Sequence, residues 1–248
     1  MRIALCFWGL CRSTHLTIES IEECIYKPLK EAGYDVTTFL HTYTLYRNYK
    51  NSRSNELNIQ LKNTNYKLLK PDNYKTENQD QIDIQLDFIK YRTMGDPWEH
   101  DTISVSDKWE TLNNHIRALW SLQKVTELWT TCGQSFDVVL YLRPDVSYKT
   151  KLKKEWIEAV HRGTVFIPDF HLYFGSNDRF AIGHPEDMKL YGNRLNEALS
   201  YSQRKPLHAE AFLTDFMRSK GVQFVTIPFR FQRVRANGLV CESDRGLF

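Results

Sequence analysis

The sequence has few of the features that mark unusual protein classes. Glycine and proline are scarce, at 11 and 8 of 248 residues, which excludes collagen-like and low-complexity chains. Lys and Arg number 33 against 30 Asp and Glu, and the resulting formal charge of +3 is too small to favour nucleic acid as a partner. No window approaches the roughly 20 apolar residues of a transmembrane helix, so we expect no transmembrane segment. Hydrophobic residues at 42% and charged residues at 25% predict a folded globular protein.

Cysteine is also sparse and shows no pattern of paired ligands. The five cysteines are Cys6, Cys11, Cys24, Cys132 and Cys241. Their odd number and the lack of CxxC or Cys/His spacing argue against a disulfide framework and against structural zinc. The apolar start of the chain is soon interrupted and lacks a small-residue cleavage site, so we expect no signal peptide. Reduced thiols and no export signal together predict a cytoplasmic protein.

The first 40 residues predict an α/β unit. The apolar run at 2–7 is typical of a buried strand, and a helical pattern through Ile18, Ile21, Ile25 and Leu29 follows it. We expect this helix to end near Gly33 and a second strand to cover 35–40, leading into His41 and Thr42. A strand, a helix and a strand in this order favour a parallel sheet with a right-handed crossover.

Residues 44–107 lose this regularity, because they are rich in Asn, Lys, Tyr, Asp and Gln. We interpret them as an insertion or lid over a cleft, with one short strand at 83–89. From Lys108, apolar residues recur at helical spacing until Gly133, which predicts a long amphipathic helix. The whole chain, 1–248, is expected to form a single domain.

The most strand-like segment is 136–142, which leads into Arg143-Pro144-Asp145. Further strands are expected at 164–167, 179–182 and 222–227, and helices after His184 and Pro206. Ligands of open parallel sheets bind at the carboxyl ends of the strands. Arg143 and Asp145 are therefore candidates for holding a diphosphate, with Asp145 as ligand of Mn²⁺ or Mg²⁺ and Arg143 as phosphate clamp. An Arg–Asp ion pair that simply ends the strand is an equally good interpretation.

Two other basic segments are candidates for anion binding. Gly9 and Arg12 follow the first strand, where a glycine turn and free helix amides could receive a phosphate, although neither GxGxxG nor a P-loop is present. A plain strand-to-helix turn capped by Ser13 fits equally well. Arg233 and Arg235 are spaced to share one face of a strand and to close over phosphates; a solvated basic edge strand is the alternative.

Two carboxylates are candidates for acid–base chemistry. Asp178 lies just before a short apolar strand and follows the aromatic segment 171–174, and rings beside carboxylates are common in carbohydrate pockets. An Asx turn is its structural alternative. Glu210 stands near the start of a helix, where the helix dipole alone would favour it; as a functional group it would accept a proton.

Several segments taken in order resemble a known family. RIALCFWGLCRS, FLHTY, VVLYLRPDV, NDRFAIGHPEDMKLYGNRL, HAEAFL and FRFQRVRANG are similar to GT-A-like nucleotide-diphosphosugar glycosyltransferases of polysaccharide-building clusters and large algal viruses. The resemblance covers most of the chain outside 44–107. It implies a Rossmann-type, mixed but mostly parallel sheet flanked by helices, a nucleotide-sugar donor and a divalent cation. The family's Asp-x-Asp motif stands here as Arg143-Pro144-Asp145, so one carboxylate is replaced by arginine.

The resemblance also assigns site residues. It implies that Gly9, Arg12, His41 and Thr42 surround the nucleotide. The resulting hypothesis is a metal-assisted transferase that moves a sugar from a UDP- or GDP-sugar to a hydroxyl of a glycan acceptor, with Asp178 as first and Glu210 as second candidate for the base. A non-catalytic carbohydrate- or nucleotide-binding module is the main alternative, and a phosphotransferase or phosphatase is a third.

Overall fold

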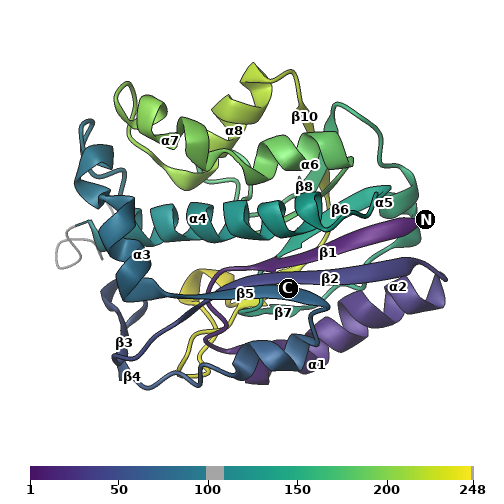
Figure 1. Cartoon of the computed structure of the whole chain (residues 1–248), viewed down its shortest axis with the longest axis horizontal. Helices are drawn as coiled ribbons and strands as arrows, with labels where there is room; N and C mark the ends of the chain where they lie inside the picture. Colours follow the sequence, from purple (N-terminus) through teal and green to yellow (C-terminus); the bar gives the residue numbers. More distant parts are fainter. Residues whose placement is uncertain (99–108, 247–248) are drawn as a thin grey trace.

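The chain folds around one mixed β-sheet, as an α/β protein. A computed structural model describes residues 1–98 and 109–246. Among these residues the main sheet has seven strands, in the order β10-β8-β9-β6-β1-β2-β5 (Figure 1). Its strands are β1 (Arg2–Trp8), β2 (Asp35–Thr44), β5 (Asn73–Asn78), β6 (Val138–Leu142), β8 (Thr164–Pro168), β9 (Phe180–Gly183) and β10 (Gln223–Ile227). Strand β9 runs antiparallel to its neighbours β6 and β8, and the other recorded pairings are parallel. The predicted α/β class with a mostly parallel sheet is confirmed.

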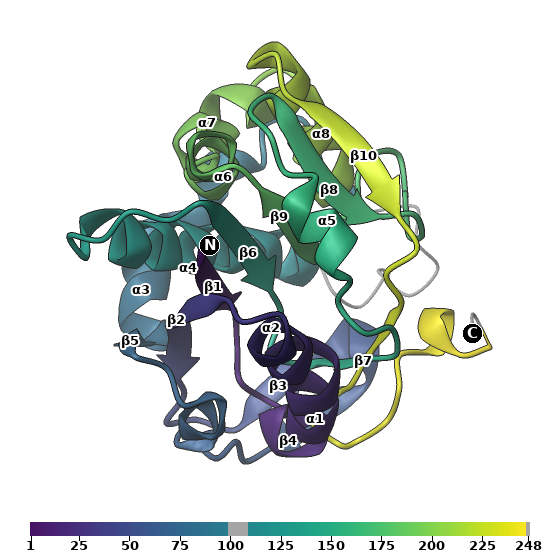
Figure 2. The same cartoon turned by 90° about the vertical axis from the view of Figure 1, so that its right-hand side faces the viewer.

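Helices cover both faces of this sheet. The helices are α1 (Thr14–Ile21), α2 (Lys27–Glu31), α3 (Gln79–Leu86), α4 (Glu110–Thr131), α5 (Lys154–Glu158), α6 (Pro185–Gly192), α7 (Leu195–Ser202) and α8 (Ala209–Ser219). One face of the sheet packs against α4 and against α6, α7 and α8, and the other against α1, α2 and α5 (Figures 1 and 2). Within the described ranges, no helix combines the length and the apolar character needed to cross a lipid bilayer.

The central strands are buried on both faces, as a parallel sheet between two helical layers requires. Along β1, Ala4 and Cys6 face the α4 layer, while Ile3 and Leu5 face the α1 layer. Helix α4 presents the apolar face that its sequence predicts, because Leu112, Ile116, Leu119, Leu122 and Trp129 are all buried. The predicted first residue of this helix, Lys108, lies outside the described residues.

The first helical segment is longer and less regular than a single α-helix. Between α1 and α2 lies a π-helical turn, η1 (Glu22–Tyr26), which immediately precedes α2 and its Pro28. Proline cannot donate a backbone hydrogen bond, and π turns are a known cause of irregularity within helices. Gly33 ends the segment with φ +71°, a backbone conformation that suits glycine, in agreement with the predicted stop.

The predicted insertion is ordered where it is described, and part of it belongs to the main sheet. Strand β5 pairs with β2 at the sheet edge. The other elements are β3 (Tyr49–Asn51), η2 (Ser52–Ser54), β4 (Glu56–Ile59), η3 (Asn65–Leu69) and η4 (Phe88–Tyr91). Residues 99–107 lie outside the described ranges.

The strand predicted at 83–89 is wrong. The segment is occupied by α3 and η4. Asn78 caps α3 by accepting the Asp80 N–H at 2.9 Å, and Ile82 and Leu86, one helical turn apart, are buried. Ile84, which would share one face of a strand with Ile82 and Leu86, is 83% exposed. The four-residue spacing therefore prevails over the two-residue spacing.

A small second sheet brings the end of the chain to the end of β6. Strand β7 (Val146–Tyr148) pairs antiparallel with β11 (Phe231–Arg233), and η6 (Glu242–Asp244) follows. The Val234 N–H donates to the Asp145 carbonyl at 2.9 Å, and the Ser13 hydroxyl donates to the Val234 carbonyl at 2.8 Å. Residues more than 200 positions apart in sequence thus meet beside Asp145.

Candidate functional site

Three loops meet at one edge of the sheet because of the strand register. Phe7 of β1 pairs with Leu142 of β6, and Leu142 pairs with Phe180 of the antiparallel β9. The loop after β1, the loop after β6 and the segment before β9 therefore share this edge. It is the carboxyl end of the parallel strands, where the sequence predicts a site.

Asp145 lies in a group of charged side chains that we call the arginine cluster: Arg12, Glu56, Arg143, Asp145 and Arg235. Arg143 binds Asp145 with two hydrogen bonds of 3.0 Å, and Arg12 Nη2 lies 2.8 Å from Asp145 Oδ2. Asp145 is only 1% exposed. Burial alone would raise the pKa of Asp145, but the guanidiniums of Arg143 and Arg12 outweigh it and hold the pKa well below its usual range. Asp145 is therefore a carboxylate at neutral pH.

The arrangement around Asp145 does not fit a divalent cation. Both carboxylate oxygens already accept hydrogen bonds from guanidinium groups, which repel a metal ion. In the part of the chain that the structure describes, no group of three or more His, Cys, Asp or Glu side chains could hold a metal. Asp145 instead orients Arg12 and Arg143, and the chemistry described below assigns no role to a cation.

Glu56 is a member of the cluster that sequence reasoning missed. It is fully buried, lies 3.0 Å from Arg12 Nη1 and accepts the Ala236 N–H at 2.5 Å. Tyr49 of β3 accepts a further hydrogen bond of 2.7 Å from Arg12. Both residues come from the irregular segment after β2, where no periodicity singles out one residue. The Arg12 Nε atom is buried and has no hydrogen-bond partner among the described residues.

Arg233 and Arg235, which the sequence predicts to share one face of a strand, bind different partners. Arg233 ends β11, and Arg235 follows it. Arg235 joins the cluster, with Nη1 at 4.0 Å from Glu56 and Nη2 at 3.0 Å from the Cys241 sulfur. Arg233 instead binds Asp244, with its Nη2 at 2.6 Å from Oδ1, and the Ser243 hydroxyl. Only Arg235 is thus placed beside the other phosphate-binding candidates.

Gly9 allows Arg143 to pack against the first loop. Its φ is +96°, and a Cβ added there would lie 3.2 Å from the Arg143 Cζ. The guanidinium also stacks over Trp8, with Cζ 4.9 Å from the ring centroid. The loop amides are used internally: Gly9 N–H donates to the Ser121 hydroxyl and Cys11 N–H donates to the Thr42 hydroxyl. Because these two amides are already bonded, the group of this loop that a phosphate could contact is the Arg12 side chain.

His41 and Thr42 lie within β2, which extends to Thr44 rather than ending before them. Both are buried. His41 Nδ1 lies 2.8 Å from Ser121 Oγ, and Nε2 lies 3.0 Å from Glu77 Oε2. Burial lowers the pKa of His41 despite the Glu77 carboxylate. His41 connects β2 to α4, and Thr42 connects β2 to the loop after β1. The two residues therefore hold these elements together beneath the site.

The second group on this edge, which we call the carboxylate cluster, contains His115, Asp178, Arg179, His208 and Glu210. Arg179 connects the two predicted bases: Nη1 lies 3.5 Å from Asp178 Oδ1, and Nη2 lies 3.0 Å from Glu210 Oε1. Burial would raise the pKa of Asp178, but Arg179 and its cationic neighbours prevail and lower it. Burial raises the pKa of Glu210, and the Asp178 charge adds to this. Asp178 is thus the better candidate for an ionised base.

The histidines of this cluster are neutral and incompletely hydrogen-bonded. Burial lowers the pKa of His115 to about 3 and also lowers the pKa of His208. His115 Nε2 and Arg179 Nη1 are buried without a hydrogen-bond partner among the described residues, and so is His208 Nδ1. Trp98 packs against both histidines, with ring centroids at 6.2 Å from His115 and 5.2 Å from His208. Unpaired buried polar atoms are costly, and water or a ligand commonly satisfies them.

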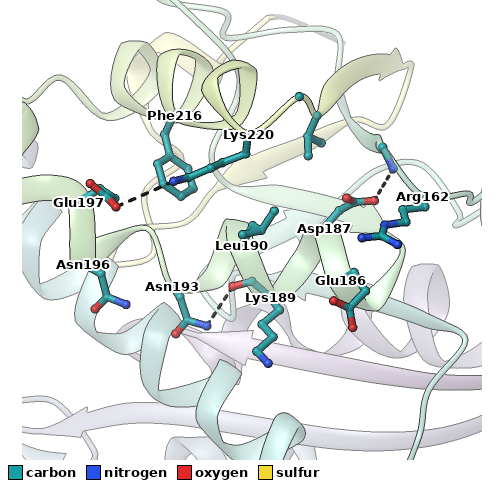
Figure 3. A pocket seen from close by; sticks show the side chains of 13 residues that line it. Arg162, Glu186, Asp187, Lys189, Leu190, Asn193, Asn196, Glu197, Phe216 and Lys220 are labelled. Atoms are coloured by element: carbon teal, nitrogen blue, oxygen red, sulfur yellow. Dashed lines mark hydrogen bonds and ion pairs between the residues drawn. The ribbon is translucent and has the colours of Figure 1, made fainter.

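Two hollows are found in the described part of the chain, one beside the site and one away from it. One, of about 450 Å³, lies beside Arg12 and is lined also by His15, Asn65 and Ala236. The other, of about 610 Å³, lies between α6 and α8 and is shown in Figure 3. Gly163, which precedes β8, lines this second hollow, so it opens at the amino end of the parallel strands. Only the first hollow adjoins the arginine cluster.

Comparisons with known proteins add no assignment. No protein-family model matches this chain, and no curated protein matches it in sequence.

Proposed function

We propose that this protein is a glycosyltransferase that moves a sugar from a UDP- or GDP-sugar to a hydroxyl group of a glycan. The observation that carries the proposal is the convergence of the arginine and carboxylate clusters on one edge of the sheet. Leu142 of β6 pairs with Phe180 of β9, so Arg143 after the first strand and Asp178 before the second lie on neighbouring segments. The resemblance of the segments that supply these residues to GT-A-like enzymes supports the same activity.

The arginine cluster suits the leaving group of such a reaction. Arg12, Arg143 and Arg235 face the carboxylates Glu56 and Asp145, which leaves a net positive charge within the cluster. The side chain of Arg143 is 21% exposed, and Arg12 lines the 450 Å³ hollow. A diphosphate bound there would receive fixed positive charge as the bond to the sugar breaks. Asp145 and Glu56 act by holding the guanidiniums in place.

The carboxylate cluster suits the attacking group. Asp178 would accept the proton of the acceptor hydroxyl while that oxygen forms a bond to the anomeric carbon and the nucleoside diphosphate leaves with the electron pair of the broken C–O bond. Arg179 keeps Asp178 ionised and orients it. Glu210, whose pKa is raised, is the less suitable proton acceptor at neutral pH.

The test is turnover of a panel of UDP- and GDP-sugars with oligosaccharide acceptors, each with Mn²⁺ and with EDTA. Release of nucleoside diphosphate that depends on Asp178 and persists in EDTA would support the proposal as stated. Binding of nucleotide or saccharide with no turnover of any donor would support the non-catalytic binding module instead. Phosphate release from simple phosphoesters would favour the phosphatase alternative.

A further inference from the structure

The loop before β9 presents large apolar side chains to solvent. Leu172 and Tyr173 are 46% and 45% exposed, and Phe174 is 87% exposed. Phe174 also has φ +56°, a left-handed conformation that bulky residues rarely adopt. Such strained positions persist where the surrounding structure fixes them, and they concentrate at ligand-binding sites.

The loop is fixed on both sides of Phe174. On one side, His171 Nε2 lies 2.8 Å from Asp244 Oδ1 and Nδ1 lies 2.6 Å from the Tyr173 hydroxyl. On the other side, the backbone at Gly175 approaches the start of α8 so closely that a Cβ would lie 2.1 Å from the Glu210 carbonyl oxygen. The contacts that hold the loop on both sides therefore keep the Phe174 side chain exposed.

Phe174 packs against the edge of the carboxylate cluster. Its ring centroid is 5.3 Å from that of His208, in an edge-on arrangement. His208 Nδ1 lies 3.4 Å from Glu210 Oε2. The His208 ring also packs against the ring of Trp98. An exposed aromatic ring thus lies beside His208 of the carboxylate cluster.

The unpaired polar atoms of the carboxylate cluster match hydroxyl groups. A neutral imidazole offers one donor and one acceptor, as a sugar hydroxyl does. His115, which is 6% exposed, has its Nε2 buried without a partner among the described residues, and Asp178 is the first charge that acts on it. Asp178 and Arg179 act on His115 with opposite charges, so the cluster suits a neutral ligand that can donate and accept hydrogen bonds, whereas a purely apolar ligand would leave these atoms unpaired.

We propose that Phe174 and His208 form the subsite of the acceptor saccharide. One apolar face of a pyranose ring stacks on Phe174, a hydroxyl hydrogen-bonds with His208, and the reacting hydroxyl points toward Asp178. This subsite rests on the proposed function for its role in transfer, although saccharide binding can be measured without turnover.

The experiment is a saturation-transfer NMR titration of the full chain with the methyl α- and β-pyranosides of glucose, galactose and mannose, in the presence of UDP. We expect at least one of them to bind, and Phe174→Ala to raise its Kd about 3- to 10-fold, the range of a single aromatic contact. Phe174→Trp should keep the affinity. Tyr46→Ala is the matched control, because Tyr46 is 79% exposed on another loop; it should leave the Kd unchanged.

Donor turnover by the wild-type protein, measured in parallel with the oligosaccharide acceptors, separates the two proposals. Saccharide binding that depends on Phe174 without turnover of any donor would overturn the transferase and leave the subsite standing. Failure of all six glycosides to bind, or equal Kd values for wild type and Phe174→Ala, would overturn the subsite whether or not donors are hydrolysed.

Discussion

The arginine cluster and the carboxylate cluster lie on the same edge of the sheet but satisfy their polar groups differently. In the first, both oxygens of Asp145 and both of Glu56 have partners. In the second, Asp178 has a longer ion pair of 3.5 Å with Arg179. Each cluster keeps one buried guanidinium nitrogen without a hydrogen-bond partner in the described part of the chain, Arg12 Nε and Arg179 Nη1, and the second adds His115 Nε2. A carboxylate whose two oxygens accept short hydrogen bonds holds its neighbours in position, whereas a more loosely paired carboxylate can accept a proton. The comparison assigns orientation to Asp145 and chemistry to Asp178.

The largest effect is expected from Asp178→Asn, which keeps the shape of the side chain but removes the proton acceptor. Turnover should fall by about 10²- to 10⁴-fold, with little change in the KM of the donor. Steady-state kinetics of nucleoside diphosphate release measure both quantities. Asp215→Asn, a carboxylate of α8 that pairs with Lys205, is the control and should retain activity. Normal turnover by Asp178→Asn would contradict the role of Asp178 as the base.

Asp145→Ala should act mainly on stability. Removing one partner of a buried ion pair leaves uncompensated charge, here on Arg12 and Arg143, and costs about 3–5 kcal/mol of unfolding free energy. Urea denaturation measures it. Asp80→Ala is the control, since the Arg47–Asp80 pair is solvent-exposed and should contribute less than about 1 kcal/mol. Equal losses for the two variants would contradict the orienting role of Asp145.

Gly9→Ala is expected to cost about 1–3 kcal/mol, because it combines a strained positive φ with a contact against Arg143. Gly133→Ala is a matched control: its φ is +78°, and a Cβ there would meet no heavy atom of the described chain within 4 Å. The difference in thermal unfolding between the two variants isolates the contact with Arg143. No difference would mean that Arg143 moves away without penalty.

The last prediction concerns pH. The folded pKa of His115 lies near 3, below the ordinary value of 6.5, so the unfolded chain binds one more proton between these values. Stability from this group is therefore complete above about pH 6.5 and is lost as pH falls, by up to about 1.4 kcal/mol per pH unit. His115→Gln should make the unfolding free energy less steep between pH 6 and 4.5. Parallel curves for the two proteins would show that His115 is protonated in the folded state.

The sequence predicts the main elements of the fold where one period dominates. The apolar runs of β1 and β6 and the helical spacing of α4 all have their predicted type. The segment at 83–89 is predicted wrongly because Ile82, Ile84 and Leu86 together have the period of a strand, whereas Ile82 and Leu86 alone have the spacing of a helix, which the capping Asn78 favours. Such ambiguity arises wherever apolar residues are few.

The candidate site is predictable only in part, for a related reason. Arg143 and Asp178 are recognisable because each adjoins a strand end, and strand ends of a sheet meet. Glu56 and His115 reach the same edge from a short hairpin strand and a helix, and no local pattern marks them. The partners that set charge and pKa are thus contributed by tertiary packing, which a single sequence does not display.

The bonds from Ser13 and Asp145 to Val234 also constrain when the site can form. The bond from Ser13 spans 221 residues and joins the first loop to the last part of the chain, and contacts of such sequence separation are slow to form and late in folding. During synthesis, the sheet strands from β1 to β9 are available long before Val234 leaves the ribosome. We therefore expect the nascent protein to form its sheet first and the arginine cluster last. A chain that ends before Val234 should then be folded but lack the proposed activity.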